Sequence, residues 1–302
     1  MTNTDPEQAI PGAAPTADPS TSPEPLSVII PAHNEQGSIS HLLTALTSGE
    51  DGSGLDIVVV CNGCTDNTAN VARRHGPGVR VAEVATASKA LSLRRGDELA
   101  RGFPRAYVDA DVVIDRASLL RLRDALADGS VLACGPRRVV ALDKSGPLVR
   151  WYYDVWQRLP QVEQGLFGRG VVMVSAEGYE RLRGLPQVMS DDLAMSEAFS
   201  ARERRVVTDA LVVIQAPRTV RDLLRRRVRV VTGNAQADDH GLRHHESRTS
   251  ARRLLEMASH SPRLAMRLPV FLSITLLARV LSRRAVRAGD FTTWQRDDSS
   301  RA

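Results

Sequence analysis

Cysteine and aromatic residues are scarce in this 302-residue chain, and each shortage argues against one class of protein. The three cysteines, Cys61, Cys64 and Cys134, are too few for a disulfide framework, which favours a reducing compartment. Aromatic residues make up 4% of the chain, and no aromatic platform is interleaved with the basic residues. Because nucleic-acid binders use such platforms or a docking motif, we expect no nucleic-acid partner.

The chain also lacks an ordinary signal peptide and an uninterrupted apolar run of membrane-spanning length. Residues 1–25 contain no basic residue and six of the sixteen prolines, which predicts a disordered leader. The apolar stretch Leu268–Leu281 has 14 residues. As a helix it would cover about 21 Å, less than the roughly 30 Å hydrocarbon core of a bilayer. We therefore predict a buried or interfacial helix there.

Basic residues are concentrated at the end of the chain, and lysine is nearly missing among them. Residues 1–217 hold 22 basic and 27 acidic side chains, whereas residues 218–302 hold 18 basic and 8 acidic ones. This asymmetry points to an anionic surface or acceptor. Lys89 and Lys144 are the only lysines. We expect a cytoplasmic protein, with peripheral contact to the inner face of the cell membrane as a hypothesis.

Short apolar runs alternate with segments of helical periodicity over the first half of the chain. This rhythm predicts an α/β fold with a mostly parallel, Rossmann-like sheet flanked by helices and ligands at the carboxyl ends of its strands. We expect a catalytic domain over residues 26–235 and a basic helical extension over residues 236–302. The runs that we interpret as strands are Leu26–Ile30, Asp56–Val60, Val79–Val84, Ala106–Val108 and Val131–Cys134.

Two carboxylates stand where the fourth apolar run ends, at Asp109 and Asp111. In a strand, residues two apart point to the same side, so these carboxylates could converge on one hard cation. A cation at a strand end could neutralise a diphosphate. Lys89 begins a predicted helix, where an ammonium could contact a phosphate or a ribose. A solvated surface lysine is the competing interpretation.

Polar residues also follow the first two predicted strands. Pro31 ends the first strand, and Asn34 and Glu35 after it could bind a base or ribose; Asn62 and Asp66 follow the second strand. Helix caps and a tight turn are the alternative interpretation of both segments. The spacing of Cys61 and Cys64 also resembles a redox pair, whereas a zinc site would need a second cysteine pair.

A second acidic pair, Asp191–Asp192, could take a proton from an acceptor hydroxyl and orient it, or could simply cap a helix. The glycine-rich segment Gly165–Gly170 could let an acceptor approach the backbone. An arginine cluster that includes Arg226 and Arg229 could contact a diphosphate or lipid phosphate. A solvated helix face explains the same cluster without any ligand.

Taken in order, these segments resemble family 2 glycosyltransferases of the glycosyltransferase A fold. The segments that carry the resemblance lie within residues 26–235. They are Leu26–Glu35, Asn62–Thr68, Ser88–Ala90, Asp109–Asp111 and the doublet Asp191–Asp192.

The resemblance implies a nucleotide-diphosphate sugar as the donor, with Mg²⁺ or Mn²⁺ bridging Asp111 to the diphosphate. Asp109 would help bind the ribose or the metal. Asp192 would deprotonate an acceptor hydroxyl, which is then glycosylated with inversion of the anomeric configuration. Roles in cell-envelope polysaccharide or glycolipid synthesis follow from the same resemblance, and the acceptor could be lipid-linked.

The chain departs from the family pattern at two places. Cys61 and Asn62 stand where the family has an acidic pair that helps read the base; Asn62 offers both a donor and an acceptor. The Gln-x-x-Arg-Trp box of processive members is missing, which favours transfer of a single sugar. A non-catalytic nucleotide-sugar binding protein is the alternative.

Overall fold

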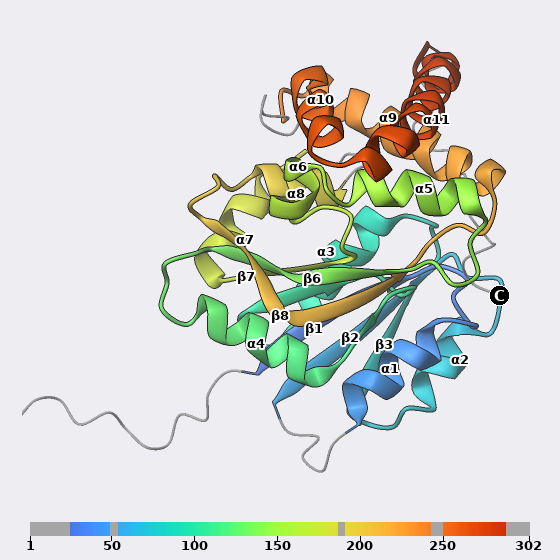
Figure 1. Cartoon of the computed structure of the whole chain (residues 1–302). Helices are drawn as coiled ribbons and strands as arrows, with labels where there is room; N and C mark the ends of the chain where they lie inside the picture. Colours follow the sequence, from blue (N-terminus) through green and yellow to red (C-terminus); the bar gives the residue numbers. More distant parts are fainter. Residues whose placement is uncertain (1–24, 49–53, 187–190, 243–249, 288–302) are drawn as a thin grey trace, which may run out of the picture.

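The protein was analysed as a computed structural model that describes residues 25–48, 54–186, 191–242 and 250–287 (Figure 1). The predicted leader, apart from Pro25, and the segment around Trp294 lie outside these ranges. The strands of the described residues are β1 Leu26–Ala32, β2 Leu55–Asn62, β3 Val79–Val84, β4 Arg105–Val108, β5 Val113–Ile114, β6 Ala133–Ala141, β7 Val171–Val174 and β8 Arg204–Gln215. The helices are α1 Ile39–Thr47, α2 Thr68–Arg73, α3 Lys89–Leu99, α4 Arg116–Leu126, α5 Pro147–Trp156, α6 Pro160–Gln164, α7 Ala176–Arg183, α8 Asp191–Glu197, α9 Val220–Asp239, α10 Ala251–His260 and α11 Pro262–Arg287.

All eight strands join one sheet in the order β3-β2-β1-β4-β7-β6-β8-β5. β1 pairs in parallel with β2 and β4, and β2 pairs in parallel with β3, as the buried apolar runs predicted. β7 is antiparallel to both β4 and β6, and the short β5 is antiparallel to β8. The predicted mostly parallel α/β sheet flanked by helices is therefore confirmed, with antiparallel strands inserted on one side of β4.

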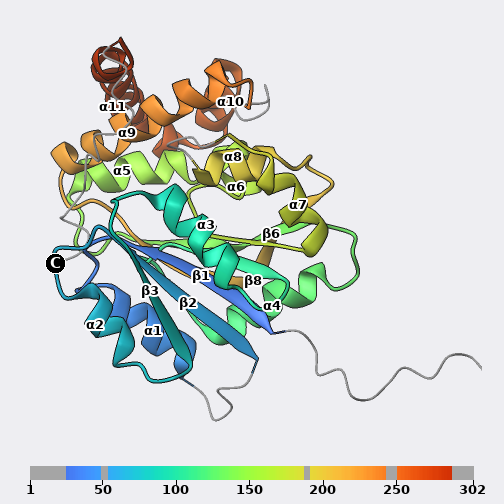
Figure 2. The same cartoon turned by 180° about the vertical axis from the view of Figure 1, so that it is seen from behind.

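Alternating residues of β1 face two separate hydrophobic cores, because successive side chains of a strand point to opposite faces. Val28 and Ile30 join the core formed with α1 and α4, whereas Ile29 joins the core on the face covered by α3. Gly96 lets α3 approach β1 closely: a Cβ at this position would lie 2.3 Å from a methyl carbon of Ile29. The two views show α3 on the opposite face of the sheet from α1 and α2 (Figure 2).

The chain ends in a helical layer that packs over α5, away from the sheet (Figure 1). Its core contains Tyr152 of α5, Leu223 of α9, Leu254 of α10, and Phe271 and Ile274 of α11. The expected domain boundary between residues 235 and 236 lies inside α9, and the division into domains stays a prediction.

The predicted length of the last apolar helix is wrong. We took Leu268–Leu281 as its extent, but α11 runs over 26 residues, from Pro262 to Arg287. Arginines at both ends interrupt the apolar run without ending the helix, because arginine has a high helix propensity. By length and composition, the 22-residue stretch Pro262–Arg283 could cross a membrane.

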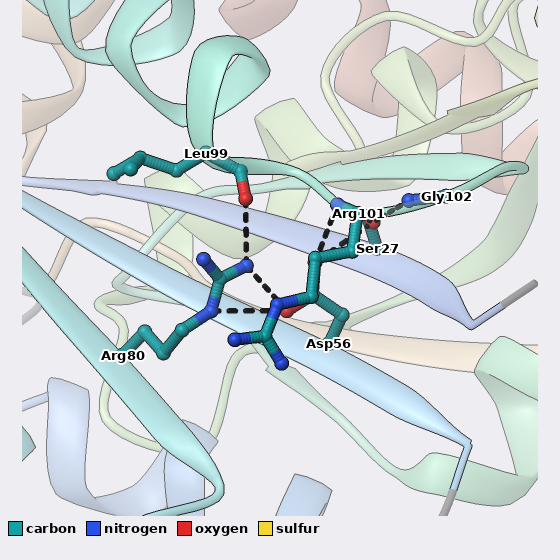
Figure 3. A network of polar contacts seen from close by, with 6 residues as sticks. All are labelled: Ser27, Asp56, Arg80, Leu99, Arg101 and Gly102. Atoms are coloured by element: carbon teal, nitrogen blue, oxygen red, sulfur yellow. Dashed lines mark hydrogen bonds and ion pairs between the residues drawn. The ribbon is translucent and has the colours of Figure 1, made fainter.

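A buried polar network fixes the amino ends of the first strands, at the opposite end of these strands from Ala32 and Asn62 (Figure 3). Asp56 accepts hydrogen bonds from Ser27 Oγ at 3.0 Å and from Arg101 N at 2.9 Å, and it is ion-paired with Arg80. Arg80 also donates to the carbonyl of Leu99 at 2.8 Å. The network thus ties the chain after α3 to β1, β2 and β3.

Candidate active site

The loops that follow β1 and β2 are joined by reciprocal hydrogen bonds between Asn34 and Thr65. Asn34 Nδ2 donates to Thr65 Oγ1 at 3.1 Å, and Thr65 N donates to Asn34 Oδ1 at 2.7 Å. Asn34 has a left-handed φ of 52°, which asparagine tolerates better than most residues. The two loops therefore form one connected surface at the carboxyl ends of these strands.

The other polar residues predicted in these loops also have partners within them. Asn62 Nδ2 donates at 3.0 Å to the carbonyl at the end of β1, and Glu35 accepts from Ser38 Oγ at 2.7 Å. Asp66 accepts from the backbone N–H of Thr68 at 3.0 Å. It precedes α2 rather than lying in its first turn, because its carboxylate binds the first N–H of that helix. Contact of these side chains with a donor stays a prediction.

The two cysteines of this region do not have the properties of a redox pair. Burial raises the pKa of Cys61 to about 12, and the neighbouring Cys64 adds to this effect. A thiol must ionise to act as a nucleophile, so Cys61 is unreactive near neutral pH. The tight-turn interpretation of this segment fits the structure better.

A cleft collects side chains from segments that are far apart in the sequence. It is a narrow hollow that is partly open to solvent. Its walls come from the end of β1, the start of α3, the end of β4, the start of β7 and the first turns of α8. The residues that line it are Pro31, Lys89, Leu93, Tyr107, Val108, Asp109, Gly170, Val171, Val172, Asp191, Asp192 and Met195. Five residues that the sequence singled out thus meet in one hollow: Pro31, Lys89, Asp109, Asp191 and Asp192.

Lys89 connects the two acidic pairs inside this cleft. Its Nζ lies 2.6 Å from Asp109 Oδ1 and 2.9 Å from Asp191 Oδ2. Burial alone would lower the pKa of Lys89, but the two carboxylates outweigh it and raise that pKa, so the ammonium stays charged. The Lys89 ammonium therefore lies between two carboxylates. The competing interpretation, a solvated surface lysine, does not describe this arrangement.

Asp192 is held by the glycine-rich loop. Its Oδ2 accepts from the backbone N–H of Gly168 at 2.7 Å, and its Oδ1 accepts from Leu193 N at 2.8 Å. Burial raises the pKa of Asp192, and the negative charge of Asp191 raises it further. A carboxylate with a raised pKa is a stronger base, which suits proton abstraction from a hydroxyl.

Arg138 is a residue of this site that the sequence did not reveal. It lies on β6, donates from Nη1 to the carbonyls of Phe167 and Gly168 at 3.2 Å each, and stacks over the Trp156 ring at 4.8 Å. Burial lowers its pKa to about 10, while the carboxylate of Asp192 acts in the opposite direction. No motif marks this arginine, because its partners are backbone carbonyls and a distant tryptophan.

The buried residue Arg169, which is 2% exposed, holds the glycine-rich loop in place through hydrogen bonds. Its guanidinium donates to the carbonyls of Gly165 at 2.8 Å, Pro136 at 2.9 Å and Glu163 at 2.6 Å. Burial lowers the pKa of Arg169 to about 9. Arginine is usually a surface residue, so nothing in the sequence indicated that Arg169 is buried beneath this segment.

Asp109 and Asp111 do not lie on a strand, so the strand argument for their convergence is wrong. β4 ends at Val108, and the two carboxylates lie in a turn in which Val112 N donates to Asp109 O at 3.4 Å. Asp109 N is hydrogen-bonded to Gly170 O at 2.8 Å, next to the Val108–Val171 pair of β4 and β7, so the pairing of the two strands reaches Asp109 and the chain turns after it.

The carboxylates of the site can hold a hard divalent cation only when a bound ligand supplies further oxygen atoms to the metal. In the described part of the chain, no three His, Cys, Asp or Glu side chains gather closely enough to hold a metal. Carboxylate oxygens suit Mg²⁺ or Mn²⁺, which keep positions for phosphate and water. When ionised, the three carboxylates that line the cleft (Asp109, Asp191, Asp192) outnumber its one lining cation, Lys89, by two charges, which a divalent ion could balance.

Arg226 and Arg229 lie on α9, and neither lines the cleft. Arg226 Nη1 donates to the carbonyl of Gln215 at 3.1 Å, at the end of β8. Their predicted contact with a diphosphate therefore stays a prediction.

A mostly parallel α/β sheet with paired carboxylates after β4 and an acidic doublet at the same cleft is the arrangement of the glycosyltransferase A fold. Residues 27–174 match the protein-family model described as glycosyl transferase family 2. Over these residues, which run from β1 to β7, the chain is similar to that family.

Relatives and solved structures agree with this assignment. A dolichol-phosphate mannosyltransferase of Pyrococcus furiosus is 27% identical over 173 residues, which cover 56% of this chain and 46% of the relative. An uncharacterized glycosyltransferase of Mycobacterium tuberculosis is 35% identical over 117 residues, covering 38% and 50%. A mannosyltransferase of Pyrobaculum calidifontis, solved with GDP-Man and Mn²⁺, shares the fold with a TM-score of 0.60 at 21% identity, covering 91% of this chain and 77% of that one.

The matched part of the chain spans half or less of the length of these curated relatives. The activity that each name states therefore belongs to that relative and is not assigned to this chain.

Proposed function

We propose that this protein transfers a single sugar from a nucleotide-diphosphate sugar to an acceptor hydroxyl, with inversion at the anomeric carbon. The observation that carries the proposal is the meeting of Asp109, Lys89 and the Asp191–Asp192 doublet in one cleft. The family match and the Mn²⁺ and GDP-Man bound to a protein of the same fold support it. We infer that the chain uses Mg²⁺ or Mn²⁺ in the same way.

Asp109 and Asp111 would hold the divalent cation together with the donor diphosphate. The cation, when bound, supplies positive charge that stabilises the departing nucleotide diphosphate. Lys89 keeps Asp109 in place and adds a positive charge next to it. The nucleoside would be contacted by the ends of β1 and β2 and by the loops that follow them, through Pro31, Asn34, Glu35, Asn62 and Asp66.

Asp192 would act as the general base. Its carboxylate, fixed by Gly168 N–H, takes the proton of the acceptor hydroxyl. The acceptor oxygen then forms a bond to the anomeric carbon from the face opposite the diphosphate, and the bond from that carbon to the diphosphate oxygen breaks. Asp191 is ion-paired with Lys89, which suits a role in orienting the acceptor.

The pKa of Asp192, which is raised by burial and by the negative charge of Asp191, also sets the pH dependence of transfer. Because the pKa of Asp192 is raised, its base form is lost as the pH falls through that raised value. We expect the acid limb of kcat/KM to lie above the ordinary range of an aspartate.

Replacing Asp192 by Asn tests this function. We expect transfer to fall by about 10²- to 10⁴-fold, since the loss of a general base has this effect, while donor binding stays nearly unchanged. Asp124→Asn, at an exposed position on α4, is the matched control and should transfer normally.

The assay combines a panel of nucleotide sugars with Mn²⁺, and then with chelator, and measures release of the nucleotide diphosphate and donor binding by calorimetry. Proton NMR of the product gives its anomeric configuration. Donor binding by the unmodified chain without any turnover would identify a non-catalytic binding protein instead. A product with retained configuration would contradict the inverting mechanism.

A further inference from the structure

Helices α10 and α11 expose large apolar side chains on the side of the molecule opposite α1 and α2 (Figure 1). Met266 is 72% exposed, Leu255 68%, Leu276 56% and Val280 55%. Leu272, Leu277 and Leu281 of α11 are exposed as well. Single exposed leucines are common on soluble proteins, but a run of them on two neighbouring helices indicates an interaction surface.

The exposed side chains of α11 form a stripe along its length. Leu272, Leu276 and Val280 follow one another at intervals of four residues, and Leu277 and Leu281 run beside them. Residues four apart lie on the same face of an α-helix. We call these five residues, together with Met266 and Leu255, the apolar stripe.

The opposite face of α11 is packed against the rest of the protein. Phe271, Ile274 and Ala278 are buried, and the Phe271 ring stacks on Tyr152 of α5 with centroids 5.1 Å apart. Arg267 forms an ion pair with Asp154 of α5. The helix is thus apolar on two faces, and the protein core covers only one of them.

The charge around the apolar stripe is positive. The α11 segment contains no aspartate or glutamate, and its Arg263, Arg279 and Arg283 are exposed. On α10, Arg252 and Arg253 are exposed too, and Arg252 is paired with Glu256. Arginines that flank exposed leucines are the pattern of helices that lie in the headgroup region of anionic bilayers.

The packing of α11 decides between lying on a bilayer and crossing it. A crossing helix would have to leave its contacts with α5 and α9 and break the Arg267–Asp154 pair. It would also place Arg279 within the apolar part of the helix, where a charged side chain is costly. A helix in the plane of the surface keeps these contacts and leaves its arginines in water.

We propose that the apolar stripe of α10 and α11 docks the protein onto the surface of an anionic lipid bilayer, with α11 lying in the plane of the membrane. The stripe inserts among the acyl chains just below the headgroups, and the flanking arginines bind lipid phosphates. This attachment is independent of sugar transfer, and would bring the cleft close to lipid-linked acceptors.

Flotation of the full-length protein with vesicles tests the proposal. We expect binding to phosphatidylcholine vesicles that contain phosphatidylglycerol, weaker binding to pure phosphatidylcholine, and release by alkaline carbonate. The double variant Leu276→Glu, Val280→Glu should lower the affinity for anionic vesicles about tenfold or more, because it removes apolar side chains from the stripe. The control Leu211→Glu, which changes an exposed leucine on β8, should bind as the unmodified chain does.

A second variant, Arg279→Glu with Arg283→Glu, keeps the apolar side chains and reverses the charge. We expect it to lose the preference for anionic vesicles. Equal vesicle binding by the stripe variant and the unmodified chain, with both folded by circular dichroism, would overturn the proposal. So would resistance to carbonate, which identifies a spanning helix, or a dimer that dissociates in the stripe variant and does not bind vesicles.

The tests of membrane attachment and of sugar transfer can fail independently of each other. A chain that floats with vesicles and transfers no sugar contradicts only the proposed transfer, and a chain that transfers sugar to a soluble acceptor without floating contradicts only the attachment.

Discussion

The Lys89 ammonium binds two carboxylates, Asp109 and Asp191, that are 82 positions apart in the chain. In the proposed function, Asp109 lies on the donor side of the cleft and Asp191 on the acceptor side. Because the lysine pairs with both, it holds the two halves of the cleft at a fixed separation. The pair also occupies an oxygen of Asp109 that a divalent cation would use.

Replacing Lys89 by Met should therefore have two opposite effects. In the absence of nucleotide, Mn²⁺ should bind about tenfold more tightly, since no ammonium competes for Asp109. Sugar transfer should fall by about 10²-fold, because the carboxylates lose the group that positions them. Electron paramagnetic resonance of free Mn²⁺ and nucleotide release measure the two effects.

The chain supplies its own control in Lys144, its other lysine, which is exposed and lies outside the cleft. Lys144→Met should leave both quantities unchanged. Unchanged Mn²⁺ affinity and unchanged transfer in Lys89→Met would show that the bridge has no functional role.

The segment between α6 and β7 positions groups on both sides of the cleft. Gly168 N–H binds Asp192, and Gly170 O accepts from the backbone of Asp109. Gly170 has a φ of 66°, and a Cβ there would lie 2.4 Å from Val112 Cγ1 and 3.3 Å from Asp109 Oδ2. A side chain at this position must therefore displace the turn that carries Asp109.

Gly170→Ala should reduce transfer by about tenfold or more and destabilise the protein by about 1–3 kcal/mol, because it combines backbone strain with a clash. Gly241→Ala is the matched control: Gly241 has the same φ of 66°, but nothing lies within 4 Å of its Cβ position. It should show only the strain cost of roughly 1 kcal/mol in urea unfolding and keep full activity. Equal activity of the two variants would contradict a positioning role for Gly170.

At the scale of the whole molecule, stability and chemistry are placed at opposite ends of the parallel strands. The Ser27–Asp56–Arg80 network closes the amino ends, and the cleft opens at the carboxyl ends (Figure 3). A change in the network should therefore alter the free energy of unfolding without altering the chemistry.

Asp56→Ala should destabilise the protein by about 3–5 kcal/mol, because it leaves the guanidinium of Arg80 and buried donors without their acceptor. Donor affinity at low temperature should stay within about twofold, since the cleft is untouched. Urea unfolding and calorimetry measure the two quantities, with Asp124→Ala as the exposed control. A loss of donor affinity in the folded variant would show that the two ends are coupled.

The sequence was sufficient for the sheet, because buried parallel strands are continuous apolar runs such as Asp56–Val60 that few other structures produce. It was insufficient for the antiparallel insertion of β7, since Val171–Val174 looks the same in either direction. Helix α5 begins at Pro147, directly after Gly146, because proline is favoured at the first helical position.

The candidate site was predictable only in its parts. Strand ends brought Pro31 and Asp109 to one edge, but the bridge through Lys89 and the support from Arg138 and Arg169 join residues distant in the sequence. No local pattern encodes such pairs. Asp109 and Asp111 were expected to share one side of a strand because they follow the apolar run Ala106–Val108, but β4 ends at Val108 and the chain turns after Asp109.

The acidic doublet Asp191–Asp192 enters the cleft from α8, seventeen residues beyond the end of β7. Under the proposed function, a polypeptide that ended with β7 would keep Asp109, Asp111, Lys89 and the segments proposed to bind the nucleoside, but it would lack the proposed general base. We expect such a shortened form to bind nucleotide sugars without transferring them.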